Sequence, residues 1–307
     1  MTTSLTFATR PSALALWQTR WVMHSLQQAW ANLHCSERLI TTQGDRILDK
    51  PLPEIGGKGL FTQELENELY QGNVQAAVHS LKDLPVEAPP GLVLGAIPKR
   101  GEVRDALISA QGHSLEDLPK GALVGTSSLR RSAQLLARRP DLHIQPLRGN
   151  VDTRLRKAAQ GDYDAIVLAG AGLERLGLAD RISQWLPLDV MLPAPGQGAL
   201  AVQCRSEDGD TLNRLAAIED WETRSAVSAE RAFLQGLGGG CSVPVAAYAA
   251  IQDGIIHLTG RVISLDGRQV IDCRMSGGNP AQVGLSCARQ AIAQGAGELL
   301  AAILPAE

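Results

Sequence analysis

The chain has few aromatic residues, no long apolar run and little net charge. Phenylalanine, tryptophan and tyrosine make up 4% of its 307 residues, and the formal net charge is −3. Proteins that bind nucleic acid usually carry a basic surface and aromatic side chains that stack on bases, so we expect no nucleic-acid partner. No apolar stretch approaches the roughly 18 residues that a membrane-spanning helix needs, so we expect no membrane partner.

The cysteines fall into no pattern that is typical of a metal site or a disulfide framework. Their number is odd, and the sequence has no C-x-x-C pair and no cysteine–histidine spacing that would build a zinc site. The first residues lack the basic and then apolar segments of a signal peptide. We expect a cytoplasmic protein without a bound metal. Its five cysteines are Cys35, Cys204, Cys241, Cys273 and Cys287.

Cys241 stands in a glycine loop. Three glycines, residues 238–240, come directly before it, and glycine accepts backbone angles that other residues avoid. Residues 223–237 have the apolar spacing of a helix that ends at the first of these glycines, and the pattern becomes strand-like after Pro244. The loop leaves two alternatives open: a thiol displayed at a surface, or a buried structural cysteine beside an ordinary helix end.

Strands and helices alternate along most of the chain. Strands are predicted at 5–8, 75–79, 122–125, 143–147, 165–169 and 199–202, and helices at about 12–22, 61–72, 126–136 and 151–160. From about residue 221 the order changes to a helix, three strands near 243–251, 255–264 and 269–275, and a closing helix over 280–302. A hairpin turn is predicted at Asp266-Gly267. The fold class is therefore α/β, with two α/β domains and a small C-terminal α+β domain.

Basic residues are concentrated between Arg130 and Lys157. This span holds eight basic residues and only two acids. Arg138 and Arg139 fall at a predicted helix C-terminus, where cations are favourable. The remaining arginines near helix starts oppose the helix dipole, and a bound anion would remove that conflict. These are Arg130, Arg131 and Arg148.

Asp83 follows Ser80 and Lys82 at the carboxyl end of a predicted apolar strand. Functional sites of α/β folds lie at this end of the strands. An aspartate before a helix is also a common N-cap, so Asp83 has both a structural and a functional interpretation.

Motifs along essentially the whole chain resemble those of the porphobilinogen deaminase (hydroxymethylbilane synthase) family. The segment around Cys241, from Glu230 to Ala246, resembles the attachment signature of that family. Six further segments match in order and spacing: residues 8–15, 56–61, 77–85, 125–131, 147–154 and 193–198.

The resemblance implies two lobes like those of periplasmic binding proteins, with the site in the cleft between them. Residues 1–98 and 199–216 would form domain 1, residues 104–192 domain 2, and residues 221–307 domain 3. A loop over residues 42–60 would act as a lid. Glu54 stands where some members carry a lysine, and no role is assigned to it.

The resemblance also implies a transferase of tetrapyrrole (haem, porphyrin) biosynthesis that works as a monomer. Its dipyrromethane cofactor, made from two porphobilinogens, would be joined to Cys241 by a thioether. Four further porphobilinogen molecules condense head to tail on this primer with loss of ammonia, and hydrolysis releases 1-hydroxymethylbilane.

The family's functional residues match positions in this chain. Asp83 would be the catalytic residue. Cofactor binding would involve Cys241, Ser80, Lys82, Thr126, Ser128, Arg130, Arg131, Arg148, Gly149 and Arg154. Substrate binding would involve Arg10, Ser12, Gln18, Lys58, Phe61, Arg175 and Gln197. Each pyrrole carries an acetate and a propionate, which explains why a weakly acidic chain concentrates arginine in one region.

Two other functions agree less well with the sequence. A simple anion-binding module would give no purpose to the third domain and its cysteine. A cysteine acyltransferase or protease would need a histidine base, and His257 is the only histidine after residue 221.

Overall fold

The computed structural model describes residues 4–46, 60–238 and 243–303. These residues form two compact units. The first unit contains residues 4–46, 60–101 and 198–224, and the second contains residues 102–197, 225–238 and 243–303.

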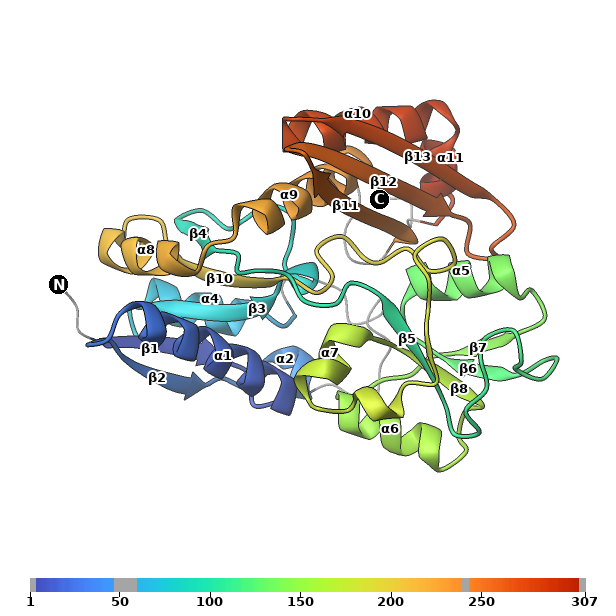
Figure 1. Ribbon diagram of the computed structural model, residues 1–307, viewed down its shortest axis with the longest axis horizontal. Helices are drawn as coiled ribbons and strands as arrows, with labels where there is room; N and C mark the ends of the chain where they lie inside the picture. The colour runs from blue at the N-terminus through green and yellow to red at the C-terminus, as the bar shows by residue number, and fades with distance from the viewer. Residues whose placement is uncertain (1–3, 47–59, 239–242, 304–307) are drawn as a thin grey trace. The chain divides into compact units, whose positions relative to one another are not determined.

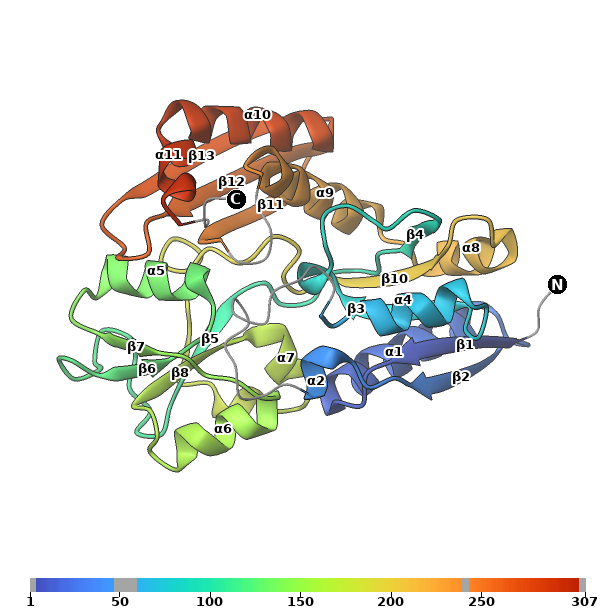
Figure 2. The same cartoon turned by 180° about the vertical axis from the view of Figure 1, so that it is seen from behind.

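The first unit is built on a five-stranded sheet in the order β2-β1-β3-β10-β4. Strands β1, β2 and β3 are parallel, and β10 is antiparallel to both β3 and β4. The strands are β1 (Ser4–Thr9), β2 (His34–Leu39), β3 (Ala76–Ser80), β4 (Leu92–Ala96) and β10 (Leu200–Arg205). The helices, seen from both sides in Figures 1 and 2, are α1 (Ala13–Ala29), α2 (Gln43–Arg46), α4 (Gln63–Tyr70) and α8 (Gly209–Leu215).

The second unit contains a five-stranded sheet with the same plan, in the order β7-β6-β8-β5-β9. Here β6, β7 and β8 are parallel, and β5 is antiparallel to β8 and β9. The strands are β5 (Asp105–Ser109), β6 (Leu123–Gly125), β7 (His143–Gln145), β8 (Ala165–Ala169) and β9 (Gln184–Trp185). The helices are α5 (Leu129–Arg138), α6 (Val151–Ala159) and α7 (Gly170–Arg175).

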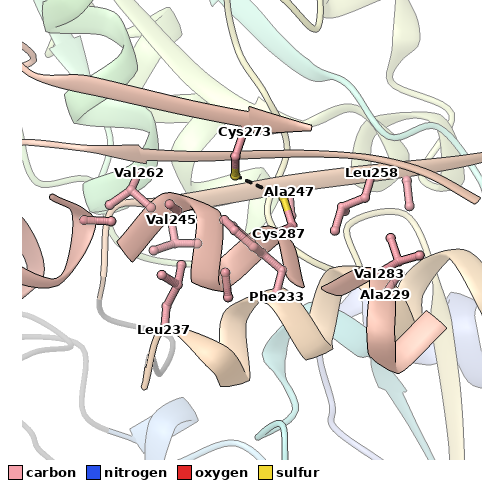
Figure 3. Close-up of a cluster of buried hydrophobic side chains, with 14 of the residues drawn as sticks. Ala229, Phe233, Leu237, Val245, Ala247, Leu258, Val262, Cys273, Val283 and Cys287 are labelled. Atoms are coloured by element: carbon pink, nitrogen blue, oxygen red, sulfur yellow. Dashed lines mark hydrogen bonds between the residues drawn. The ribbon is translucent and has the colours of Figure 1, made fainter. Parts of the chain in front are cut away.

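A smaller antiparallel sheet completes the second unit, in the order β11-β12-β13. Its strands are β11 (Val245–Gln252), β12 (Ile255–Ile263) and β13 (Val270–Gly277), with α9 (Trp221–Gly236), α10 (Pro280–Ala293) and α11 (Ala296–Ala301). Figure 3 shows Phe233 of α9 and Val283 of α10 pointing toward the strands. A Cβ atom added at Gly260 of β12 would lie 2.4 Å from the Phe233 ring, so the ring packs directly on the strand backbone.

The predicted fold class is confirmed, since both α/β sheets and the small C-terminal sheet are present. The single closing helix predicted over residues 280–302 is wrong. It breaks into α10 and α11 at Gly295, whose φ of +99° does not continue an α-helix. The residue limits predicted for the three domains remain a prediction.

Candidate active site

Asp83 lies at the end of a three-residue 3-10 turn, Leu81–Asp83, that follows β3 directly. Its side chain is exposed, and the next residue, Leu84, is extended. Because no α-helix begins at this point, the alternative that Asp83 is an N-cap is wrong. The carboxylate is held at the carboxyl end of a buried strand, where the fold class places functional groups.

Ser80 and Gln18 are brought together in the first unit. The Nε2 atom of Gln18 in α1 donates a hydrogen bond of 2.9 Å to the Ser80 Oγ atom at the end of β3. Ser12 has a structural contact in the same unit, because its Oγ atom accepts from the Ala15 amide and caps α1. A predicted cofactor-binding residue and a predicted substrate-binding residue are therefore direct neighbours.

Arg10 already has an anionic partner within the first unit. Its Nε atom donates to Asp45 Oδ2 at 3.2 Å, and its Nη2 atom contacts the other carboxylate oxygen. Burial alone would raise the pKa of Asp45, but Arg10 and hydrogen bonds from Thr42 hold it below its usual value. The guanidinium also stacks on Phe61, 4.3 Å from the ring centre. Sequence analysis missed this use of Asp45.

The first turn of α5 is organised by two hydroxyl groups. Ser128 is the N-cap, and its Oγ atom accepts a hydrogen bond of 3.4 Å from the Arg131 amide. Thr126 Oγ1 in turn accepts from the Ser128 amide at 3.2 Å. The helix predicted over about residues 126–136 therefore begins at Leu129, directly after this cap.

Arg130 and Arg131 are buried and share the carboxylate of Asp105, the first residue of β5. Arg130 Nη2 lies 2.8 Å from Asp105 Oδ2, and Arg131 Nη2 lies 2.7 Å from Oδ1. Two guanidinium groups and one carboxylate leave a net charge of +1 in this cluster. Burial lowers the pKa of Arg130, and the Asp105 charge offsets part of that effect.

Asp105 was not singled out by sequence analysis. It is fully buried at the start of an apolar strand, Asp105–Ser109, where an acidic residue needs a partner. An acidic residue in an apolar segment of a chain rich in arginine was therefore the signal from which a buried ion pair could have been predicted.

Arg148 carries an unused donor. Its Nη1 atom is buried and has no hydrogen-bond partner among the described residues. The next residue, Gly149, has a φ of +108°, and a Cβ atom there would lie 2.9 Å from Thr153. The Gly149 carbonyl accepts from Arg154 Nε at 2.7 Å. The turn before α6 thus brings three of the predicted cofactor-binding residues together.

Arg175 and Gln197 differ in their surroundings. Burial lowers the pKa of Arg175, the last residue of α7, to about 10, and Glu174 offsets part of that effect. Gln197 is fully buried, and its Nε2 atom donates to the Val103 carbonyl at 2.8 Å and to Asp105 at 3.1 Å. Gln197 therefore supports the arginine–aspartate cluster.

Cys241 and Lys58 lie outside the described residues. The elements flanking Cys241 are those predicted: α9 ends at Gly236, Gly238 has a φ of +67°, and β11 begins at Val245. His257, the histidine that a cysteine protease would need, is hydrogen-bonded through Nδ1 to Ser276 Oγ at 2.9 Å.

The described residues contain no cluster of three or more histidine, cysteine, aspartate or glutamate side chains that could hold a metal ion. Over residues 4–46, 60–238 and 243–303, no helix has both the length and the apolar character needed to cross a membrane.

Comparison with known families decides the assignment. The family described as porphobilinogen deaminase, dipyromethane cofactor binding domain, matches residues 5–213, and its C-terminal domain matches residues 225–293. The chain belongs to the porphobilinogen deaminase family. A deaminase from Brevibacillus brevis is 53% identical over 297 residues, covering 96% of each chain. One from Roseiflexus castenholzii is 50% identical and covers 98% of this chain and 100% of its own.

Two solved structures resemble the chain more distantly than these deaminase relatives do. The methionine-binding protein MetQ has a TM-score of 0.44 at 11% identity and covers 75% of this chain and 95% of its own. A YaeC-family lipoprotein from Enterococcus faecalis has a TM-score of 0.42 at 14% identity and covers 72% and 93%.

Proposed function

We propose that Asp83 and the basic residues described above carry out the reaction of the porphobilinogen deaminase family. In that reaction porphobilinogen molecules condense head to tail with loss of ammonia, on a dipyrromethane cofactor, in tetrapyrrole synthesis. The exposed Asp83 carboxylate, which follows buried β3 and caps no helix, is the observation that carries the proposal.

The residues present fit a cofactor that carries several carboxylates. Arg148 offers a buried Nη1 atom without a hydrogen-bond partner in the described part of the chain. The cluster of Arg130, Arg131 and Asp105 retains one positive charge beside the N-terminus of α5. Guanidinium groups and helix N-termini both favour bound carboxylates. This set of donors suits dipyrromethane.

Cys241 would hold the cofactor covalently, and the other residues would bind its acetate and propionate groups. When bound, dipyrromethane supplies the pyrrole carbon to which substrate units are added. The residues assigned to cofactor binding are Ser80, Lys82, Thr126, Ser128, Arg130, Arg131, Arg148, Gly149 and Arg154.

Porphobilinogen itself carries two carboxylates and an amine, so its site needs positive charge and orientation. We assign direct contacts to Arg10, Gln18, Lys58, Phe61 and Arg175. Ser12 and Gln197 have supporting roles: Ser12 caps α1, and Gln197 donates a hydrogen bond to Asp105. Arg175 remains a cation at neutral pH, since burial lowers its pKa only to about 10.

Asp83 stabilises the positive charge that develops when porphobilinogen loses ammonia. That charge spreads over the pyrrole ring, and a fixed carboxylate lowers the barrier to its formation. An exposed aspartate beside the site can also accept the protons that each condensation releases.

The mass of the intact purified chain tests the proposal. We expect a mass greater than that of the sequence by one dipyrromethane unit, with the modification on the peptide that contains Cys241. The Cys241→Ala variant should fold and lack both the added mass and the activity. Active enzyme of unmodified mass, or modification of Cys35, Cys204, Cys273 or Cys287 instead, would overturn the assignment.

We also propose that the enzyme is a cytoplasmic monomer. The four described cysteines are free, which agrees with a reducing compartment. Sedimentation of the purified chain checks the monomer, and a mass of two or more chains would contradict it.

A further inference from the structure

The hairpin that joins β12 and β13 lies against the backbone of α5 within the second unit. Both views in Figures 1 and 2 show the loop of this hairpin beside α5. Gly267, at the turn, has a φ of +73°. A Cβ atom added there would lie 2.3 Å from the Ala137 amide nitrogen and 2.8 Å from the Ala133 carbonyl oxygen. Because these are main-chain atoms, α5 could not make room by a side-chain rotation.

A second contact between the same two elements comes from Arg261 of β12. Its Nη1 atom donates to Gln134 Oε1 at 3.2 Å and to the Asp189 carbonyl at 3.0 Å. Asp272 of β13 holds the guanidinium in place through Nε at 2.6 Å and Nη2 at 2.9 Å. Arg261 therefore links the small sheet to the buried side of α5.

Gln134 connects this contact to the arginine cluster. Its Nε2 atom donates to the Leu192 carbonyl at 3.0 Å, and its Oε1 atom accepts from the Leu192 amide at 2.9 Å. Arg130 Nη1 donates to the same Leu192 carbonyl at 2.7 Å. A continuous network of hydrogen bonds thus runs from Arg261 of β12 to the first turn of α5.

We propose that Gly267 and Arg261 are positioning residues, which set α5 and its arginine cluster at a fixed place relative to the small sheet. This inference rests on the proposed function, because Cys241 stands in the sequence between α9 and β11, the first strand of that sheet. A cofactor tethered to Cys241 reaches Arg130 and Arg131 only if the spacing between the sheet and α5 fits its length. Small displacements of a tethered group reduce its effective concentration strongly.

The chain offers a matched pair of glycines for the test. Gly254, in the hairpin between β11 and β12, also has a φ of +73°, but nothing lies within 4 Å of its added Cβ atom. Alanine at either position therefore introduces the same backbone strain, and only Gly267→Ala adds the collision with α5.

The measurement is the rate at which the cofactor-free chain acquires its primer. Each variant is produced in cells that cannot make porphobilinogen and mixed with porphobilinogen, and the gain in mass is followed. We expect Gly267→Ala to acquire the primer at least about tenfold more slowly than Gly254→Ala, per folded molecule. Equal rates would overturn the inference. A wild-type chain that never gains mass would instead contradict the proposed function.

Arg261→Met keeps the inference testable if Gly267→Ala does not fold. Its control is Arg268→Met in the same hairpin, because the Arg268 side chain is 87% exposed and pairs only loosely with Asp266, at 3.6 Å. We expect severalfold slower primer acquisition in Arg261→Met than in Arg268→Met, at unchanged KM for porphobilinogen once the primer is in place. A purely structural role would lower the yield of folded Arg261→Met and leave the rate per folded molecule unchanged.

Discussion

The sulfur atoms of Cys273 and Cys287 lie 3.0 Å apart in the core of the small sheet (Figure 3). Cys273 belongs to β13 and Cys287 to α10, and their side chains are 2% and 0% exposed. The hydrogen bond to Cys287 and burial together raise the pKa of Cys273. Because both thiols are buried away from reagents, this pair should be inert while the protein is folded.

Alkylation of the native protein checks that expectation. Iodoacetamide should label the half-buried Cys35 at least about tenfold faster than Cys273 or Cys287, and the buried pair should react only after unfolding. Peptide mass spectra taken over time measure the three rates. Comparable labelling of Cys273 and Cys35 in the folded chain would contradict the packing described here.

Removing the charge of Asp83 should abolish most turnover. Asp83→Asn keeps the size of the side chain but loses the charge, and we expect turnover to fall by about 100- to 1,000-fold with the primer still bound. Asp83→Glu keeps the charge and should retain measurable activity. Glu87→Gln, a nearby exposed carboxylate, is the control and should behave like the wild type. Near-normal turnover of Asp83→Asn would mean that another carboxylate serves this role.

Arg148 gives a cleaner test of cofactor binding than Arg130 or Arg131. Loss of Arg130 would leave the buried Asp105 with one partner fewer, and breaking a buried ion pair costs about 3–5 kcal/mol of stability. Arg148→Leu should fold and lack the primer in its intact mass, because its buried Nη1 atom has no hydrogen-bond partner within the described chain.

Two further variants show whether loss of the primer is specific to Arg148→Leu. Arg175→Leu should carry the primer but add substrate slowly, since Arg175 is assigned to porphobilinogen. Arg138→Leu should keep both properties, because its side chain is 58% exposed and pairs only loosely with Glu116, at 3.5 Å. If all three variants carried the same number of pyrrole units, Arg148 and Arg175 would not have the separate roles in primer and substrate binding that we assign to them.

His79 should make the folded protein less stable in weak acid. Its pKa is lowered from 6.5 to about 4, mainly because the ring is buried; Arg10 contributes to the lowering, and Gln203 offsets part of it. Between pH 6.5 and 4 the unfolded chain therefore binds a proton that the folded chain does not. The free energy of unfolding should fall across this range by an amount on the order of 3 kcal/mol.

Chemical denaturation at pH 7 and pH 4.5 measures the effect of His79. His79→Gln keeps a polar side chain but cannot titrate, so its stability should change much less between the two pH values. An equal loss in both proteins would show that other groups cause the acid sensitivity.

The sequence predicted several elements that have strong local signals, although the largely apolar strands β4 and β5 were missed. Strands β3 and β8 are continuous apolar segments, and the helices predicted from about residues 12 and 126 begin after the N-caps Ser12 and Ser128. Strand β2, with the sequence HCSERL, was missed because its polar side chains give no buried-strand pattern. Strand β9 has only two residues, which is too short for any periodicity.

Contacts between distant parts of the chain could not be predicted in this way. Arg131 and Asp105 are separated by 26 positions, and only the strand order brings the start of β5 beside α5. The hydrogen bond between Gln18 and Ser80 spans 62 positions. The motifs were specific enough to name the family, but the neutralising partners Asp45 and Asp105 depend on tertiary structure.

The position of β10 determines when the first sheet can be completed during synthesis. This strand, Leu200–Arg205, separates β3 from β4, yet the ribosome makes it after every strand of the second five-stranded sheet. Until it emerges, β3 and β4 each present an unpaired edge, which favours association with other chains. The second sheet, whose strands are contiguous between Asp105 and Trp185, needs no later segment. The nascent chain therefore completes its later sheet first, and a fragment ending before residue 200 would be prone to aggregate.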